Sequence, residues 1–155
     1  MMDLILWRHA EAQDPTDDGH EDMSRALTGR GEKQAARMAH WLDRQLPEGA
    51  RVLVSPARRC EQTAQALERK YKIRPELAPG GTVEQLLEAA QWPHGKATVL
   101  IIGHQPVLGQ AIARLLGLSA SECVVRRGAV WWLRNRERGA LSQTVVVTVQ
   151  SPEVL

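Results

Sequence analysis

The stretch Thr-Val-Leu-Ile-Ile-Gly-His-Gln-Pro (residues 98–106) joins a short apolar run to a polar segment. Such a run, ended by a glycine, is typical of a strand that is buried on both faces. Pro106 suits the first turn of a helix, and apolar residues recur at helical spacing from Val107 to Leu116, before Gly117. This strand–loop–helix unit predicts a sheet of parallel strands covered by helices.

Apolar strands and amphipathic helices alternate along the rest of the chain. We predict further strands at 4–7, 51–54, 129–133 and 144–149, a loop at 12–25, and helices at 28–46, 83–90 and along the apolar stripe from Cys60 to Tyr71. The last two strands are joined by a short polar segment, which predicts that they are antiparallel. The pattern as a whole predicts a three-layer α/β/α fold with a central, mostly parallel sheet, formed by residues 1–155 as a single domain.

Composition limits the classes of function. The chain has 155 residues, of which 43% are hydrophobic and 25% charged, as in ordinary globular proteins. A net charge of +2 is too small to indicate a nucleic-acid binder, and no apolar run approaches the roughly 18 residues of a membrane span. The first seven residues lack the pattern of a signal peptide, and two cysteines make no disulfide framework. We therefore expect a cytoplasmic protein with neither nucleic acid nor membrane as a partner.

Polar residues follow three of the predicted strands, at residues 8–11, 55–59 and 103–106. Because ligands of open α/β sheets bind at the carboxyl ends of the strands, we expect these segments to share one crevice. Two predicted helices also begin there, and helix N-termini attract anions. The sequence therefore predicts a site for a dianion at this edge of the sheet.

Two arginines and two histidines give this site its chemistry: Arg8, His9, Arg59 and His104. Guanidinium groups bind phosphoryl oxygens in a bidentate manner, and a neutral imidazole can attack phosphorus and carry the group as phosphohistidine. One histidine is then a nucleophile and the other a donor to a non-bridging oxygen. The arginines should keep the nucleophile neutral near pH 7.

Several motifs are similar to those of a known family. Residues 6–12 resemble the Arg-His-Gly signature of the histidine phosphatase superfamily, residues 55–64 its Ser-Pro-x-x-Arg-Ala-x-Gln-Thr block, and residues 103–106 its Gly-His-x-Pro block. Residues 22–28, with Gly31, resemble the Arg-x-Leu-Thr-x-x-Gly segment of the small SixA-type phosphohistidine phosphatases. The resemblance extends from Leu4 to about Leu116 and implies a phosphoglycerate mutase-like fold.

By this resemblance His9 is the nucleophile, Arg8, Arg59 and His104 form the phosphate pocket, and Arg25 is a further phosphate contact at the rim. The sequence departs from the family pattern in two residues, Ala10 in place of glycine and Cys60 in place of alanine. Larger relatives also place a general acid after the second block, and no residue here matches it clearly. The carboxylates left open for that role are Glu11, Glu76 and Glu84.

The lack of a clear general acid in the sequence bears on which class of substrate the protein can cleave. A phosphohistidine can expel a neutral imidazole, whereas a phosphate ester expels an alkoxide that needs a proton. We therefore predict a phosphatase that acts on phosphohistidine in a protein, through a phosphohistidine intermediate on His9. One alternative is a small-molecule phosphomonoesterase or mutase that acts on sugar, glycerate or nucleotide phosphates, and another is a non-catalytic phospholigand-binding module.

No cofactor or metal is expected, because the chain has no H-E-x-x-H, C-x-x-C or P-loop motif. The other histidines, His20, His40 and His94, match no motif and are expected to be non-catalytic.

Overall fold

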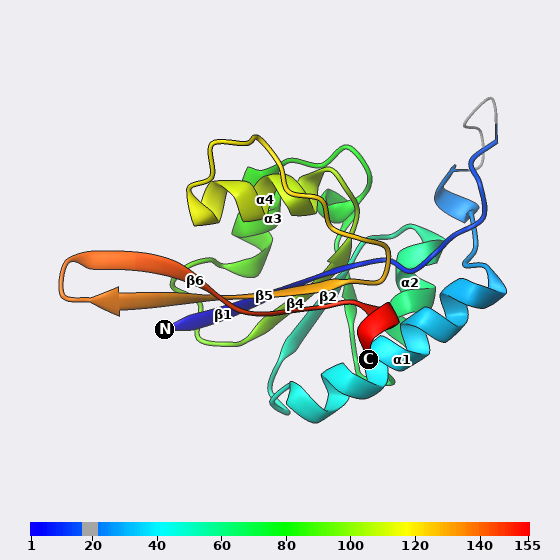
Figure 1. Cartoon of the computed structure of the whole chain (residues 1–155), viewed down its shortest axis with the longest axis horizontal. Helices are drawn as coiled ribbons and strands as arrows, with labels where there is room; N and C mark the ends of the chain where they lie inside the picture. Colours follow the sequence, from blue (N-terminus) through cyan, green and yellow to red (C-terminus); the bar gives the residue numbers. More distant parts are fainter. Residues whose placement is uncertain (17–21) are drawn as a thin grey trace.

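The computed structural model describes residues 1–16 and 22–155 (Figure 1). A six-stranded sheet has the order β3-β2-β4-β1-β5-β6. Its strands are β1 (Met2–Arg8), β2 (Arg51–Val54), β3 (Lys72–Ile73), β4 (Val99–Gly103), β5 (Val130–Arg138) and β6 (Leu141–Gln150). The first four in space are mutually parallel, whereas β5 is antiparallel to both β1 and β6. The predicted mostly parallel sheet and the antiparallel last pair are confirmed.

Four helices cover the two faces of the sheet, with α1 (Gly29–Gln45) and α2 (Arg58–Gln65) on one side and α3 (Val83–Ala90) and α4 (Val107–Leu116) on the other (Figure 1). Alternate residues of a strand point to opposite faces, so β1 and β4 serve two cores. Leu6 and Ile101 pack in the core beneath α3 and α4, whereas Trp7 and Ile102 pack in the core beneath α1 and α2. The predicted three layers are therefore present.

The helix predicted along the stripe from Cys60 to Tyr71 is shorter than expected. It ends at Gln65, a turn follows with Glu68 at a positive φ of 56°, and the chain then forms β3. Leu67 lies beyond the helix but is still buried in the core beneath α1 and α2, so the apolar stripe continues through the turn. Strand β3 was not predicted, because its two residues are exposed at the edge of the sheet and form no apolar run.

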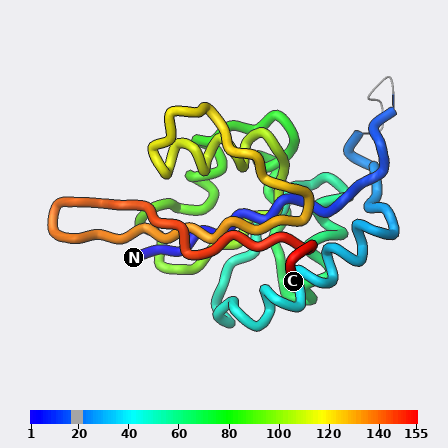
Figure 2. The backbone as a smooth tube through the Cα atoms, in the orientation of Figure 1, coloured from blue at the N-terminus to red at the C-terminus, as the bar shows by residue number. Residues whose placement is uncertain are grey.

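The segment 134–142, predicted as a polar connection, is mostly strand. β5 and β6 run on to a turn at residues 139–140, where Gly139 has a φ of +59°. Figure 2 shows this hairpin projecting well beyond the helices. The outer part of the hairpin meets little core, and its residues are mostly polar, so the sequence there carries no alternating apolar signal. Arg134 lies on β5 and binds the carboxylate of Asp3, with 2.7 Å between Nε and Oδ1.

The predicted loop at 12–25 contains a single 3-10 turn, η1 (Asp22–Ser24), among the residues described there. His20 lies outside the described residues. Two more 3-10 turns, η2 (Pro75–Leu77) and η3 (Pro152–Val154), complete the elements. Within residues 1–16 and 22–155, no helix is both long and apolar enough to span a membrane.

Helix α1 begins against the segment that follows His9. Thr28 caps the helix, and its Oγ1 accepts a hydrogen bond from the backbone N–H of Gly31 at 3.0 Å. Gly31 lies so close to Glu11 that a Cβ at this position would be 1.9 Å from the Glu11 carbonyl oxygen. A glycine here therefore lets α1 approach the backbone that carries His9.

Gly31→Ala is expected to lower the free energy of unfolding by about 3 kcal/mol, because backbone rather than a flexible side chain must move to make room. Urea denaturation followed by circular dichroism measures the loss. Gly29→Ala is the matched control on the same helix, since a Cβ there meets nothing within 4 Å. Equal stability of the two variants would contradict the close approach.

Candidate active site

The carboxyl ends of β1, β2 and β4 meet at one edge of the sheet, the right-hand end in Figure 1. There Arg8 pairs with Gly103, and Val54 pairs with Ile102. A pocket of about 240 Å³ opens at this edge. It brings together all five residues that the sequence singles out, Arg8, His9, Arg25, Arg59 and His104. The rest of its lining consists of Ala12, Asp14, Pro15, Pro79, Gln105 and Arg127.

The two imidazoles lie next to each other in the site. The ring centroids of His9 and His104 are 5.3 Å apart, and the planes are tilted by 59°. Nδ1 of His9 is 2.8 Å from the carbonyl oxygen of Ala10. A carbonyl can only accept, so Nδ1 carries the proton of the neutral ring and Nε2 keeps its lone pair. That assignment leaves Nε2 as the nucleophilic atom.

His9 is also kept in its neutral form. Burial lowers the pKa of His9 to about 4; the hydrogen bond to Ala10 opposes this, and the positive charges of Arg59, Arg8 and Arg25 lower the pKa further. A neutral imidazole is the form that can attack phosphorus.

His104 has the opposite proton arrangement. Its Nδ1 lies 3.4 Å from Nη2 of Arg59, which can only donate, so Nδ1 accepts and Nε2 carries the proton. Nε2–H donates to Oγ of Ser55 at 2.8 Å, and that oxygen also accepts from the backbone N–H of Ala57. Burial, with His9 and Arg59, lowers the pKa of His104 to about 3. A bound dianion would raise it and favour a donating imidazolium.

The guanidinium groups of Arg8 and Arg59 have donors to spare. Nη1 of Arg8 donates to the carbonyl oxygen of Val125 at 2.8 Å, and Nη1 of Arg59 donates to that of Asp22 at 2.7 Å. Within the described part of the chain, however, the Nε atoms of both arginines are buried and have no hydrogen-bond partner. Both guanidinium groups line the pocket, and their Nη atoms carry more hydrogens than the bonds above use, so they can bind a strong acceptor there. A phosphoryl group has the charge and the oxygens that these donors need.

Arg25 joins the pocket through a carboxylate that the sequence reasoning missed. Asp22 bridges two guanidinium groups: Oδ1 is 3.1 Å from Nε of Arg25, and Oδ2 is 3.2 Å from Nη2 of Arg59. Burial alone would raise the pKa of Asp22, but the two arginines lower it, so the carboxylate is ionised at neutral pH. The only sequence signal for a role of Asp22 in the site is its position three residues before Arg25.

The carboxylates left open as general acids do not line the pocket. Glu11 accepts a hydrogen bond from Oγ1 of Thr28 at 3.0 Å and lies 3.8 Å from Arg127, which does line it. Glu76 forms an ion pair with Arg74, and Glu84 forms one with Arg114. Among the described residues that line the pocket, the one carboxylate is that of Asp14, an exposed residue that sequence reasoning also missed.

The two departures from the family pattern are buried. The side chain of Ala10 packs with Leu27 and Ala35 rather than lining the pocket. Cys60 packs in the core beneath α2, as predicted, with Sγ 3.4 Å from Nε2 of His104. Burial raises the pKa of the Cys60 thiol to about 12, so the sulfur is unreactive.

The remaining histidines of the described chain lie outside the pocket. His40 is exposed on α1, and the imidazole of His94 is 80% exposed, 3.5 Å from a carboxylate oxygen of Glu137. In the part of the chain that the structure describes, no three His, Cys, Asp or Glu side chains are grouped so that they could hold a metal ion.

The neutral state of His9 gives a prediction on pH. Because the pKa is lowered, the ring should stay unprotonated as the pH falls through 6.5 and gain its proton only near pH 4. Nucleophilic attack should be lost in that same lower range, since the proton takes up the lone pair. A pH titration of the ring carbon resonance of His9 by NMR measures this. A midpoint near 6.5 would contradict the burial and charge argument.

Comparisons with known proteins point in one direction. The model of the histidine phosphatase superfamily (branch 1) matches residues 4–80. Phosphohistidine phosphatase SixA of Escherichia coli K12 is 36% identical over 122 residues, which cover 74% of each chain. A SixA homologue of Haemophilus influenzae is 30% identical over 131 residues, covering 75% of this chain and 78% of the other. The solved structure of the protein histidine phosphatase SixA complexed with tungstate superposes with a TM-score of 0.81 at 29% identity and covers 99% of both chains.

Proposed function

Because the chain belongs to the histidine phosphatase superfamily and is of its SixA type, we propose that it is a phosphatase that removes the phosphoryl group from phosphohistidine in a protein. Its α/β fold is that of the phosphoglycerate mutase-like members. The observation that carries the proposal is that His9, with an unprotonated Nε2, lines one pocket together with the guanidinium groups of Arg8 and Arg59.

In the first step Nε2 of His9 attacks the phosphorus in line. The new P–N bond forms as the bond to the substrate imidazole breaks, and the electron pair of that bond returns to the leaving nitrogen. The other nitrogen of the leaving ring already carries a proton, so the ring departs neutral. The proton on Nδ1 of His9 stays in its hydrogen bond to the carbonyl oxygen of Ala10, and this bond orients the ring for attack.

In the second step water attacks the phosphorus of the phosphorylated His9. The P–Nε2 bond breaks, inorganic phosphate leaves, and the neutral imidazole is restored. In both steps Arg8, Arg59 and His104 bind the non-bridging oxygens, with Arg25 as a further contact, because phosphoryl transfer depends on positioning and charge neutralisation. We propose that these cations suffice without a metal ion.

The carboxylates near the pocket support a phosphoramidate substrate rather than an ester. Asp22 is held ionised by Arg25 and Arg59 and so is a poor proton donor. An alkoxide leaving group needs such a donor, whereas a neutral imidazole does not. We also propose a cytoplasmic location, which the free thiols of Cys60 and Cys123 support, and a single functional domain formed by residues 1–155.

A side-by-side assay tests the substrate class. We expect a phosphohistidine-bearing protein to be hydrolysed with a kcat/KM at least about 100-fold above that of a sugar phosphate. The alkoxide that leaves from the sugar phosphate needs a proton donor, whereas the imidazole that leaves from phosphohistidine does not. Asp14→Asn should leave the phosphohistidine activity within about twofold, because that reaction asks for no proton donor. Far better turnover of the ester, lost in Asp14→Asn, would instead establish a phosphomonoesterase with Asp14 as its acid.

A further inference from the structure

A basic surface adjoins the mouth of the pocket. Two hollows of about 270 and 220 Å³ lie side by side and share Arg30, Gln34 and Glu153 in their lining. Arg127 lines both the first hollow and the active-site pocket, so the hollows adjoin the pocket. We call the positively charged residues along them the basic track: Arg30, Lys33, Arg37, Arg126 and Arg127.

Three separate segments build the basic track. Arg30, Lys33 and Arg37 occupy one face of α1, since residues three or four apart on a helix are neighbours. Arg126 and Arg127 precede β5, and η3 lies against α1 beside them (Figure 1). A Cβ on Gly128 would be 2.9 Å from Cγ of Pro152 and 3.7 Å from Cβ of Gln34, so the three segments are closely packed. This packing holds the backbone segments that carry the basic track in fixed positions relative to one another.

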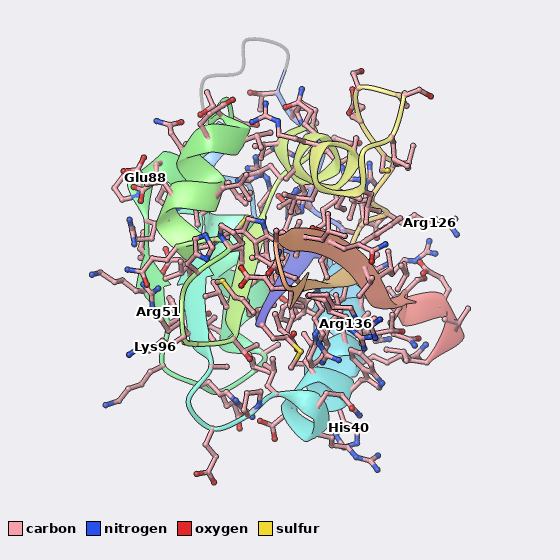
Figure 3. All side chains as sticks on the ribbon, turned by 90° about the vertical axis from the view of Figure 1, so that its left-hand side faces the viewer. His40, Arg51, Glu88, Lys96, Arg126 and Arg136 are labelled. Atoms are coloured by element: carbon pink, nitrogen blue, oxygen red, sulfur yellow. The ribbon has the colours of Figure 1, made fainter. Side chains whose placement is uncertain are left out.

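The charge along this surface is unbalanced. Five basic side chains face two acidic ones, Glu11 and Glu153. Glu11 accepts from Thr28 and lies 3.8 Å from Arg127. Glu153 accepts from Ser151, and its charge also interacts with those of Arg126 and Arg30. These two carboxylates offset only part of the positive charge. Among the described residues, Arg30, Lys33 and Arg126 form no ion pair, and all three are exposed. Figure 3 shows Arg126 extending outward from the side of the molecule.

We propose that the basic track docks an acidic surface of the phosphorylated protein whose phosphohistidine enters the pocket. The inference rests on the proposed function, which requires a protein to lie over this rim. Opposite charge at such a rim speeds encounter and fixes orientation. A nucleic acid fits less well, because no aromatic side chain lines either hollow among the described residues, and single strands bind by stacking on such rings.

The test is a charge reversal away from the reacting groups. In the Arg30→Glu/Lys33→Glu double variant, kcat/KM for an acidic phosphohistidine-bearing protein at low salt should fall about 30-fold, mostly through KM, since docking and not chemistry is changed. Activity on free phosphohistidine should stay within about twofold, because that substrate reaches only the pocket. Added salt should weaken the wild-type reaction with the protein and leave that of the variant nearly unchanged.

Arg136→Glu/Arg138→Glu is the matched control, because it reverses the same number of charges. Arg136 (Figure 3) and Arg138 are exposed on the projecting hairpin, on the part of β5 that runs away from the site. This variant should retain wild-type activity on the protein. An unchanged KM in the Arg30→Glu/Lys33→Glu variant, or an equal loss on both substrates, would overturn the docking proposal.

Binding separates failure of docking from failure of the proposed function. The acidic phosphoprotein should bind His9→Ala about 30-fold more tightly than it binds His9→Ala with both charge reversals, whether or not the wild type hydrolyses it. Equal binding would overturn docking alone, and a wild type that hydrolyses neither substrate would overturn the phosphatase alone. Competition by an oligonucleotide but not by polyglutamate would overturn docking in favour of nucleic-acid binding.

Discussion

Replacement of His9 by alanine is expected to lower kcat by at least about 10⁴-fold, because it removes the imidazole that accepts the phosphoryl group in the covalent route. The neighbouring imidazole cannot substitute, since the free nitrogen of His104 faces Nη2 of Arg59 and its other nitrogen is bound to Ser55. Single-turnover assays with ³²P-labelled phosphohistidine protein measure both the rate and the label retained on the enzyme. No acid-labile label should remain on the variant.

The fold should survive this substitution. Within the described part of the chain, the imidazole makes one hydrogen bond, to the carbonyl oxygen of its neighbour Ala10, and no helix or strand depends on it. Circular dichroism and thermal unfolding check that the variant is folded. His40→Ala, on the exposed part of α1, is the control for loss of an imidazole. Near-normal turnover by folded His9→Ala would refute the covalent mechanism.

Replacement of Arg59 by alanine is expected to lower kcat/KM by about 10³-fold, equivalent to about 4 kcal/mol of transition-state stabilisation. Arg59 is 3% exposed, carries an unpaired Nε donor and contacts His104, so its loss removes charge and orientation together. Steady-state kinetics on the phosphohistidine protein measure the effect. Arg59→Lys should recover only part of the activity, because an ammonium group keeps the charge and lacks the planar pair of donors.

Arg58→Ala is the matched control for Arg59. The two residues are adjacent in the first turn of α2, but Arg58 is exposed and lines no part of the pocket. Its removal should change kcat/KM by less than twofold. Equal effects of the two substitutions would mean that net charge, rather than a built phosphate site, drives the reaction.

Strong apolar patterns account for the parts of the fold that could be predicted. The run 99–102 is buried on both faces, and the helix at 83–90 has the predicted bounds. Strand β3 and the outer part of the β5–β6 hairpin could not be predicted, because their residues do not pack in a core. Period and apolarity mainly report burial, so elements without burial leave a weak trace in the sequence. β6 is the exception, because its β-branched run predicts a strand although Val146, Val147 and Val149 are exposed.

The candidate site divides in a similar way. Arg8, His9, Arg59 and His104 were predictable because each follows a strand or opens a helix at the ligand-binding edge of the sheet. Asp22 and Asp14 come from a long loop, and only tertiary contacts bring their carboxylates to the arginines and the pocket. The proton positions on the two imidazoles likewise depend on contacts with Ala10, Ser55 and Arg59 that no spacing in the sequence reveals.

A crystal structure with bound vanadate shows directly whether His9 is the nucleophile, since vanadate mimics the transferring phosphoryl group. We expect vanadium bonded to Nε2 of His9, with its equatorial oxygens held by Arg8, Arg59 and His104. An ion bound elsewhere, or held in the pocket with Nε2 of His9 pointing away from it, would rule out covalent catalysis by His9.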